Sequence, residues 1–339
     1  MDGDRYWQRL RWLRAHPPGH AAKNRERRDA FAASLEQAEQ LVRSAATLGP
    51  ETRPINLFYG LSQGTRAVMA AREPSDERLW LSNHGIGYKG SLDRSITNIA
   101  VEELAKPRGA FTSLARVLRS PGLPEPVPLG DLMAALPLRV PDSSWSSRPR
   151  AIAVHHLNQS EGGILTSSPY VFAGTGLWPV LDRSQGELAD SRRMLSEYIE
   201  NHYPDLRGTE PRPDGQARLT VGDSGMQFVV KLDLEQHLGS DALRQQVLES
   251  RTQRFGDQQF AIPVFGDQHA PCHPTVVLWA VLWTFSMLAR YVPVRWSQCL
   301  DVDSSQDATA LEEILQDSLS MVPWALLDAL ESVPDWSGI

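Results

Sequence analysis

A strongly apolar segment in the C-terminal part of the chain constrains the fold more than any other feature. Residues 276–289 are almost all aliphatic or aromatic, and the segment ends abruptly in Arg-Tyr-Val-Pro-Val-Arg-Trp at residues 290–296. It spans roughly 14 residues, short of the ~20 that a membrane-crossing helix needs, and it contains Thr284 and Ser286. The sequence therefore predicts a buried core helix around which the rest of the chain folds.

The composition is typical of a globular protein without a disulfide framework. The 339 residues are 41% hydrophobic and 22% charged, and the two cysteines are Cys272 and Cys299. The N-terminus has no apolar signal segment, so we expect a cytoplasmic protein without a membrane partner. The net charge of -7 argues against nucleic-acid binding over the whole surface but allows a local basic patch.

Residues 1–28 form a basic amphipathic arm. Tyr6, Leu10 and Leu13 recur at helical spacing, which favours a helix that packs on the body of the protein. The alternative is an arm that contacts nucleic acid through its basic side chains. These are Arg5, Arg9, Arg11 and Arg14.

Both ends of the remaining chain carry helical patterns. In residues 29–142 and 266–339, apolar side chains recur at steps of three and four. We expect the C-terminal region to pack on the first, with the core helix buried against a helix at 55–72. Pro323 is predicted to begin the last helix.

The middle of the chain, residues 150–265, has a mixed pattern. Strand-like runs occur at 151–157 and 226–232, and helical runs occur at 187–201 and 241–254. The predicted fold class is therefore α+β and mainly α. The N- and C-terminal segments would build a helical body, and the middle would add a small antiparallel β unit.

Four short motifs resemble the YaaC-like family of bacterial proteins. The resembling segments are residues 56–67 followed by His84-Gly85, residues 109–114, residues 129–137, and residues 285–296 followed by Val322-Pro323. The resemblance spans roughly residues 55–330, leaves the N-terminal fifth outside, and is weak in the middle. Because the family has no established activity, the resemblance transfers no catalytic residue to this chain.

Proteins of this kind are suspected to be related to helical HEPN-type ribonucleases, which share an arginine followed by a histidine with four to six residues between them. Histidine can transfer protons near neutral pH, and arginine can stabilise phosphate charge. Arg78 with His84 is the best such pair here, although Asn83-His84-Gly85 also fits a structural turn. In so arginine-rich a chain, pairs of this spacing also arise by chance. They include Arg9 or Arg11 with His16, Arg14 with His20, and Arg148 or Arg150 with His155.

The end of the core helix offers a second candidate site. Arg290, Tyr291, Arg295 and Trp296 could clamp a base or a phosphate. Alternatively, Arg290 caps the helix carbonyls and Trp296 fills the end of the core, and this is the reading that the pattern favours.

No pattern predicts a metal or a cofactor. His269, Cys272 and His273 lie close in sequence but lack a second ligand pair at zinc-like spacing. Two functions stay open. The first is a non-enzymatic interaction or regulatory subunit of a larger assembly, for example in antiviral defence, with a protein partner or self-association. The alternative is a HEPN-like effector on RNA or nucleotides, which as an enzyme would be a metal-independent, ribonuclease-like hydrolase.

Overall fold

The chain forms two compact units. The computed structural model describes residues 3–76, 79–91, 95–104, 108–138, 143–161, 164–172, 188–206, 211–213, 228–231 and 252–331. The first unit comprises residues 1–133, 138–145 and 272–339, and the second comprises residues 134–137 and 146–271.

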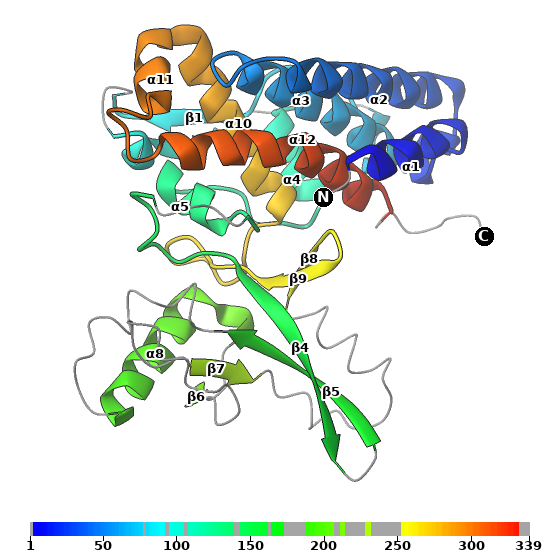
Figure 1. Cartoon of the computed structure of the whole chain (residues 1–339). Helices are drawn as coiled ribbons and strands as arrows, with labels where there is room; N and C mark the ends of the chain where they lie inside the picture. Colours follow the sequence, from blue (N-terminus) through cyan, green and yellow to red (C-terminus); the bar gives the residue numbers. More distant parts are fainter. Residues whose placement is uncertain are drawn as a thin grey trace. The chain divides into compact units, whose positions relative to one another are not determined.

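Long helices from both ends of the chain build the first unit (Figure 1). Helix α3 contacts α2, α10 and α12, while α1 contacts α2 and α12. This arrangement confirms the predicted fold class, and it confirms that the core helix packs against the helix expected at 55–72. The helices are α1 (Gly3–Ala15), α2 (Arg25–Ala46), α3 (Arg53–Arg72), α10 (Pro274–Tyr291) and α12 (Ala308–Glu331).

Helix α10 is the core helix that the sequence predicts. Every residue from Pro274 to Ser286 is buried, and each buried large apolar side chain contributes about 1.5–3 kcal/mol. Thr284 donates its hydroxyl to the Ala280 carbonyl at 2.9 Å, which satisfies a polar group inside the core. The apolar run therefore serves packing between helices.

Among the described residues, no single helix has the length and apolar character needed to cross a membrane. Helices α10 and α11 (Pro293–Leu300) meet that test only as a pair, and they are bent by 117°.

Two glycines allow α3 to sit between its neighbours. A Cβ atom at Gly64 would lie 2.3 Å from Leu326 Cδ2 of α12, and one at Gly60 would lie 2.6 Å from Val42 Cγ2 of α2. Larger residues would push these helices apart. On the rest of α3, several positions stay half-buried, among them Tyr59, Ser62 and Arg66.

Short elements complete the first unit. Helix α4 (Ala110–Val117) contacts α3 and α10. Trp279 of α10 meets Phe58 of α3 at a ring distance of 5.0 Å and Phe111 of α4 at 5.7 Å. A small antiparallel sheet has the order β1-β2-β3. Its strands are β1 (Ile86–Lys89), β2 (Ala100–Glu103) and β3 (Val127–Pro128).

Pro323 lies inside α12, so the prediction that it begins a separate helix was wrong. A proline has no N–H to donate to the carbonyl four residues earlier, which weakens a helix locally. Here Val322, Ala325 and Leu326 on either side of Pro323 are buried, and their packing carries the helix across the break.

The second unit contains an antiparallel sheet of order β6-β7-β5-β4-β9-β8 and the helix α8 (Leu188–His202). Strand β4 includes residues 152–157 of the run predicted at 151–157, and α8 includes residues 188–201 of the helix predicted at 187–201. The strands are β4 (Ile152–Glu161), β5 (Ile164–Phe172), β6 (Pro211–Pro213), β7 (Phe228–Lys231), β8 (Gln253–Phe255) and β9 (Gln258–Ala261).

The end of the helix predicted at 241–254 was wrong. Gln253 and Arg254 belong to β8, which turns into β9 at Gly256, whose φ of +62° suits a glycine. The rest of that predicted helix, residues 241–251, lies outside the described residues.

Candidate anion-binding site

Side chains from α3, from α10 and from one loop lie within electrostatic or contact range of one another. Helix α3 contributes Tyr59 and Arg66, which are seven positions apart and therefore share a helix face. The loop after α3 contributes His84, and the last turn of α10 contributes Arg290. The Arg290 guanidinium donates to the Tyr59 hydroxyl at 2.8 Å, and both arginines act electrostatically on His84.

The loop that carries His84 is fixed against the start of α4. The carbonyls of Asn83 and His84 accept hydrogen bonds from Ala110 N and Phe111 N, both at 2.9 Å. Gly85 has φ +70°, and a Cβ atom there would lie 2.8 Å from Gly109 Cα. The turn therefore requires glycine, and this contact joins two of the motifs on which the family resemblance rests.

The His84 ring lies against aromatic side chains. It meets the Phe58 ring edge-on at 5.2 Å and lies 6.1 Å from Trp279. Burial lowers the pKa of His84 below its ordinary value, and the charges of Arg290 and Arg66 lower it further. At neutral pH the ring is therefore uncharged, and its nitrogens can accept a proton or bond to a ligand.

Two arginines beside His84 have no anionic partner in the described part of the chain. Arg290 donates to the Ser286 carbonyl at 3.1 Å and to Tyr59, and its guanidinium lies over the Tyr59 and Tyr291 rings. Neither it nor Arg66 pairs with a carboxylate there. Half-buried positive charges without a counter-charge favour an anion, with which arginine makes strong, charge-assisted hydrogen bonds.

The residues predicted at the end of the core helix separate into two groups. Arg290 belongs to the His84 cluster, and Tyr291 beside it is 64% exposed. Trp296 is fully buried instead, where its Nε1 donates to the Pro50 carbonyl at 3.2 Å and its ring lies 5.2 Å from Phe285. Arg295 makes a 3.5 Å contact with the side chain of Gln298. The geometry thus gives Trp296 a packing role and leaves Arg290 and Tyr291 available to a ligand.

The arginine proposed to work with His84 is not among the described residues. Arg78 lies in the gap at residues 77–78, and the structure instead brings Arg66 and Arg290 to this histidine. The side chain of His155 also lies outside the described residues.

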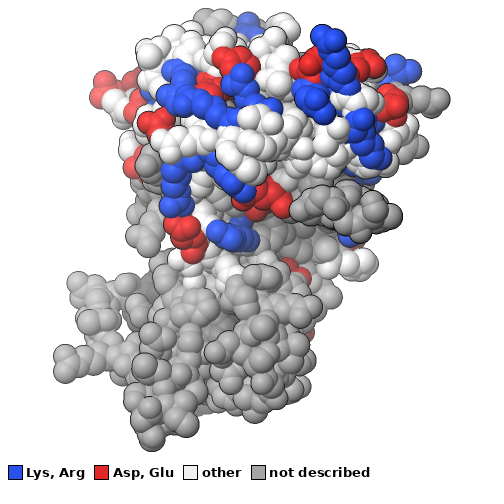
Figure 2. All heavy atoms as spheres, turned by 90° about the vertical axis from the view of Figure 1, so that its right-hand side faces the viewer, with Lys and Arg blue, Asp and Glu red and all other residues white. Residues whose placement is uncertain are grey.

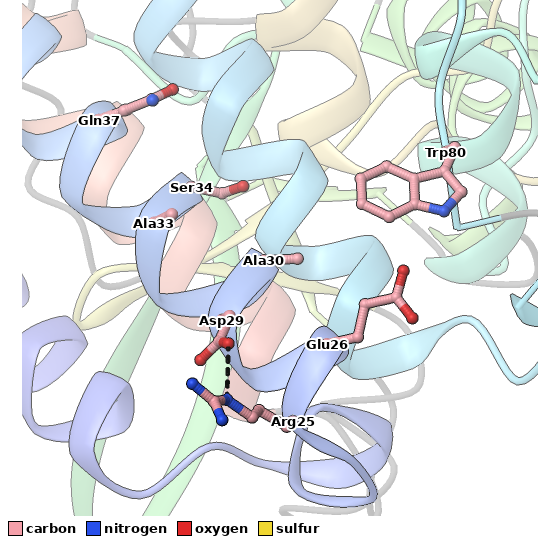
Figure 3. Close-up of a pocket in the computed structure, with 8 residues that line it drawn as sticks. All are labelled: Arg25, Glu26, Asp29, Ala30, Ala33, Ser34, Gln37 and Trp80. Atoms are coloured by element: carbon pink, nitrogen blue, oxygen red, sulfur yellow. Dashed lines mark ion pairs between the residues drawn. The ribbon is translucent and has the colours of Figure 1, made fainter.

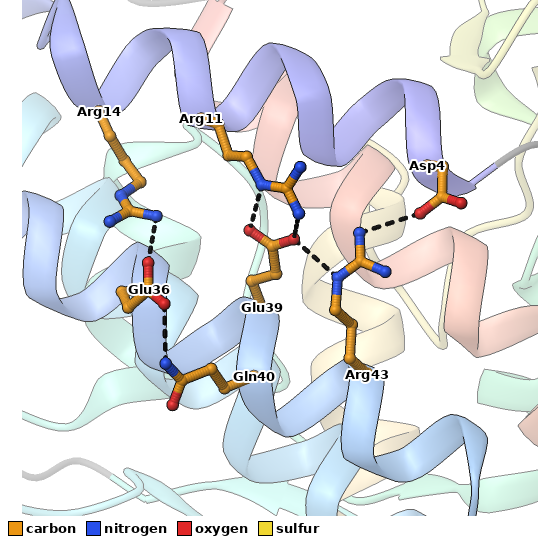
Figure 4. A network of polar contacts seen from close by, with 7 residues as sticks. All are labelled: Asp4, Arg11, Arg14, Glu36, Glu39, Gln40 and Arg43. Carbon is orange, nitrogen blue, oxygen red and sulfur yellow. Dashed lines mark hydrogen bonds and ion pairs between the residues drawn. The ribbon is translucent and has the colours of Figure 1, made fainter.

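The basic arm forms helix α1, and its apolar side is buried. The side chains of Tyr6, Trp7, Leu10 and Leu13 are all at most 5% exposed. The helix lies on α2, as Figure 4 shows.

Most arginines of this arm face carboxylates of the same chain. Arg11 pairs with Glu39 and Arg14 with Glu36 (Figure 4), and Arg9 pairs with Glu331 at 2.7 Å. Arg5 donates to the Tyr6 hydroxyl at 2.9 Å. The face shown in Figure 2 likewise has basic and acidic side chains interspersed. Such pairing leaves little basic charge for a phosphate backbone.

The histidine–cysteine stretch before α10 has structural contacts. His273 caps α10 by accepting from Thr275 N at 3.2 Å, and its Nε2 lies 3.3 Å from Asp328. Cys272 is buried, and its thiol donates to the Pro121 carbonyl at 3.4 Å. The described residues contain no group of three histidine, cysteine, aspartate or glutamate side chains that could hold a metal ion.

Sequence reasoning missed Tyr59 and Arg66 as site residues. Both lie in the first resembling motif, and the surrounding apolar residues suggested packing alone. The signal that could have found them is their seven-residue spacing, which places both polar side chains on the same face of α3.

A family model for YaaC-like proteins matches residues 4–330. The chain belongs to the YaaC-like family. The match shows that the N-terminal arm, which we expected to lie outside the resemblance, falls within it, and that it runs through the β-containing middle. Searches of curated proteins and of solved structures give no significant match. The YaaC-like motifs at residues 56–67, 84–85 and 285–296 supply all the side chains of the candidate site, which are Tyr59, Arg66, His84, Arg290 and Tyr291.

Proposed function

We propose that this YaaC-like protein is a regulatory subunit that binds a phosphate-bearing ligand between Arg66, His84 and Arg290. The observation that carries the proposal is the pair of half-buried arginines without a carboxylate partner in the described chain. Arginine side chains bind phosphate in a planar, two-pronged geometry. In a protein of net charge -7, such a local excess of positive charge is a feature that favours an anion.

A nucleotide or a short RNA suits this cluster better than inorganic phosphate. Tyr291 is largely exposed beside Arg290, whose guanidinium carbon lies 5.1 Å from the Tyr291 ring. An exposed aromatic ring next to a phosphate-binding arginine supports stacking of a base, which contributes about 1–3 kcal/mol per base. Tyr59 orients Arg290 through the bond to its hydroxyl.

The test is calorimetric titration of the purified protein at low salt with a trinucleotide RNA, a mononucleotide, pyrophosphate and ribose. We expect saturable binding of the three phosphate compounds, tightest for those with a base, and no binding of ribose. A Tyr291→Ala variant should lose the preference for a base and keep pyrophosphate binding. Equal heats for ribose and for the phosphate compounds would contradict the proposal.

The neutral His84 ring beside two arginines also supports a second function, that of a HEPN-like effector that cleaves RNA without a metal. In this case His84 would remove the proton from the ribose 2′-hydroxyl as its oxygen bonds to the adjacent phosphorus. The bond from phosphorus to the 5′-oxygen would break, and that oxygen would take a proton from water, which leaves a 2′,3′-cyclic phosphate. The arginines would stabilise the phosphate charge. Incubation of labelled RNA with wild-type protein and with a His84→Ala variant separates the two functions. Cleavage by the wild type alone would establish the effector. Intact RNA, bound at saturation by the wild type, would support the regulatory subunit.

A further inference from the structure

A pocket of about 650 Å³ lies along α2, and its lining includes none of the anion-binding residues. One wall is a face of α2, and the other is the side chain of Trp80 (Figure 3). The helix face consists of Glu26, Ala30, Ala33 and Gln37, whose spacing of four, three and four places them in one row. Because the two alanines are small, a ligand can approach the helix backbone closely.

Trp80 is held outward by the residues on either side of it. Leu79 and Leu81 are buried at 6% and 8% exposure, whereas Trp80 is 50% exposed. This alternation anchors the loop in the core and leaves a large aromatic side chain facing solvent and the pocket. The half-exposed indole offers a ligand a large apolar and aromatic surface.

An ionic clamp ties residues 73–76, which follow α3, to α2. The Arg27 side chain is 2% exposed and donates to the Asp76 carboxylate at 2.7 Å and to the Glu73 carbonyl at 2.8 Å. The backbone of Arg27 also donates to Asn24, which caps α2 at 2.9 Å. Leu79 N in turn donates to the Asp76 carbonyl at 3.3 Å, which ties the residue beside Trp80 to this clamp.

The charges at the pocket are suited to a cation. Glu26 extends towards Trp80 in Figure 3, and the described residues contain no ion-pair partner for it. Asp29 adds a second carboxylate, which is 68% exposed and lies 3.5 Å from an Arg25 side chain that is itself 93% exposed. Because both side chains are so exposed, this ion pair is weak, and a competing cation can replace Arg25 at Asp29.

The aromatic face of Trp80 is also open to a cation. Elsewhere in the first unit, the Arg9 guanidinium carbon sits 4.3 Å from the centre of the Trp12 ring, so this chain already uses tryptophan to bind arginine. Within the described residues, no lysine or arginine lies over Trp80. Tryptophan is the aromatic residue that attracts cations most strongly.

We propose that this pocket binds an arginine or lysine side chain from a segment of a partner protein. The cation would stack on Trp80 and pair with Glu26, while the aliphatic part of the segment would pack on Ala30 and Ala33. The charge complementarity of the pocket selects this occupant over an acidic one. The inference is independent of the anion-binding site, because the two sites share no residue and have opposite charge preference.

The test uses short capped peptides that carry one central arginine, one lysine or one glutamine in the same neutral sequence. Binding is followed by the indole N–H resonance of Trp80, which is assigned by its loss in Trp80→Leu. We expect saturable shifts with the arginine and lysine peptides and none with the glutamine peptide. Trp80→Leu keeps apolar bulk but removes the aromatic face, and the binding constant from calorimetry should fall roughly twofold to thirtyfold.

The Glu26→Gln variant should weaken the arginine peptide by about twofold to fivefold, as for an exposed ion pair. The matched control is Trp12→Leu. This variant should bind the peptides as the wild type does, because Arg9 already covers the Trp12 ring. If Trp80→Leu fails to fold, the proposal is still tested by the affinity of Glu26→Gln for the arginine peptide and by the comparison of the arginine and glutamine peptides. Equal affinity for the arginine and glutamine peptides, or affinity that is unchanged in both pocket variants, would overturn the proposal.

Discussion

Two arginine-rich regions of the first unit differ in whether a carboxylate is within reach. At the α1–α2 contact, Glu39 accepts from both Arg11 and Arg43, and Arg43 also reaches Asp4 at 2.9 Å (Figure 4). At the end of α3 and α10, Arg66 and Arg290 have no such partner among the described residues. The comparison teaches that the local supply of counter-charge, rather than the number of arginines, distinguishes a structural contact from a ligand site.

The presence or absence of carboxylate partners also determines how each region affects the stability of the fold. The carboxylates of the α1–α2 network hold two helices together, with Glu39 only 8% exposed at its centre. A hydrogen bond from Gln40, helped by the charge of Arg14, lowers the pKa of Glu36. The His84 cluster instead contains charges that repel each other, which is a feature that favours ligand binding at the expense of stability.

Removal of the two unpaired arginines should have the largest effect. The double variant Arg66→Gln with Arg290→Gln should weaken RNA trinucleotide binding by about 100-fold or more, because each charge-assisted bond contributes about 1.5–3 kcal/mol. Titration calorimetry measures the loss. The matched control is Lys23→Gln with Arg28→Gln, which removes the same two charges from exposed positions just before and within α2. An equal loss in the control would show that the whole surface, rather than the cluster, attracts the ligand.

Removal of Glu39, the central carboxylate of the α1–α2 network, should lower stability and leave ligand binding unchanged. Glu39→Gln should lower the free energy of unfolding by about 1–3 kcal/mol, since it leaves Arg11 and Arg43 with a weaker acceptor. Chemical denaturation measures this change, and trinucleotide affinity should stay as in the wild type. A variant of unchanged stability would mean that the paired arginines are no more structural than the unpaired ones.

The pH dependence of binding should be smaller and should run through His84. Its folded-state pKa is lowered, so the ligand-free protein should lose stability as the pH falls below about 6.5. A bound phosphodiester favours the protonated ring, so its affinity should rise over the same interval. His84→Gln should flatten the affinity profile. A profile that keeps its slope in this variant would assign the titration to another group.

Much of the fold could be predicted because its strongest signals are local. The run at residues 276–289 is too apolar to be anything but a core element. The helical spacing of Tyr6, Leu10 and Leu13 is enough to predict that the N-terminal arm is a helix with one packed face. Pro323 shows the limit of such reasoning. The rule that proline begins a helix is local, whereas the burial of Val322 and Leu326 that carries α12 past it depends on other helices.

The candidate site was only half visible in the sequence. His84 and Arg290 were singled out separately, but nothing local indicates that residues more than 200 positions apart share a cluster with Tyr59 and Arg66. The sequence also cannot distinguish Arg11 from Arg66. Both are arginines within helical patterns, and only the three-dimensional structure shows that one of them faces a carboxylate.

The most direct test of this account is to supply the missing counter-charge without removing any arginine. Ser62 lies on α3 four positions before Arg66, the same spacing as Glu39 and Arg43 in the network. We predict that Ser62→Glu abolishes trinucleotide binding in calorimetry, whereas Ser62→Gln, which has the same size and no charge, largely retains it. Equal affinity in the two variants would contradict the claim that the unpaired arginines create the site.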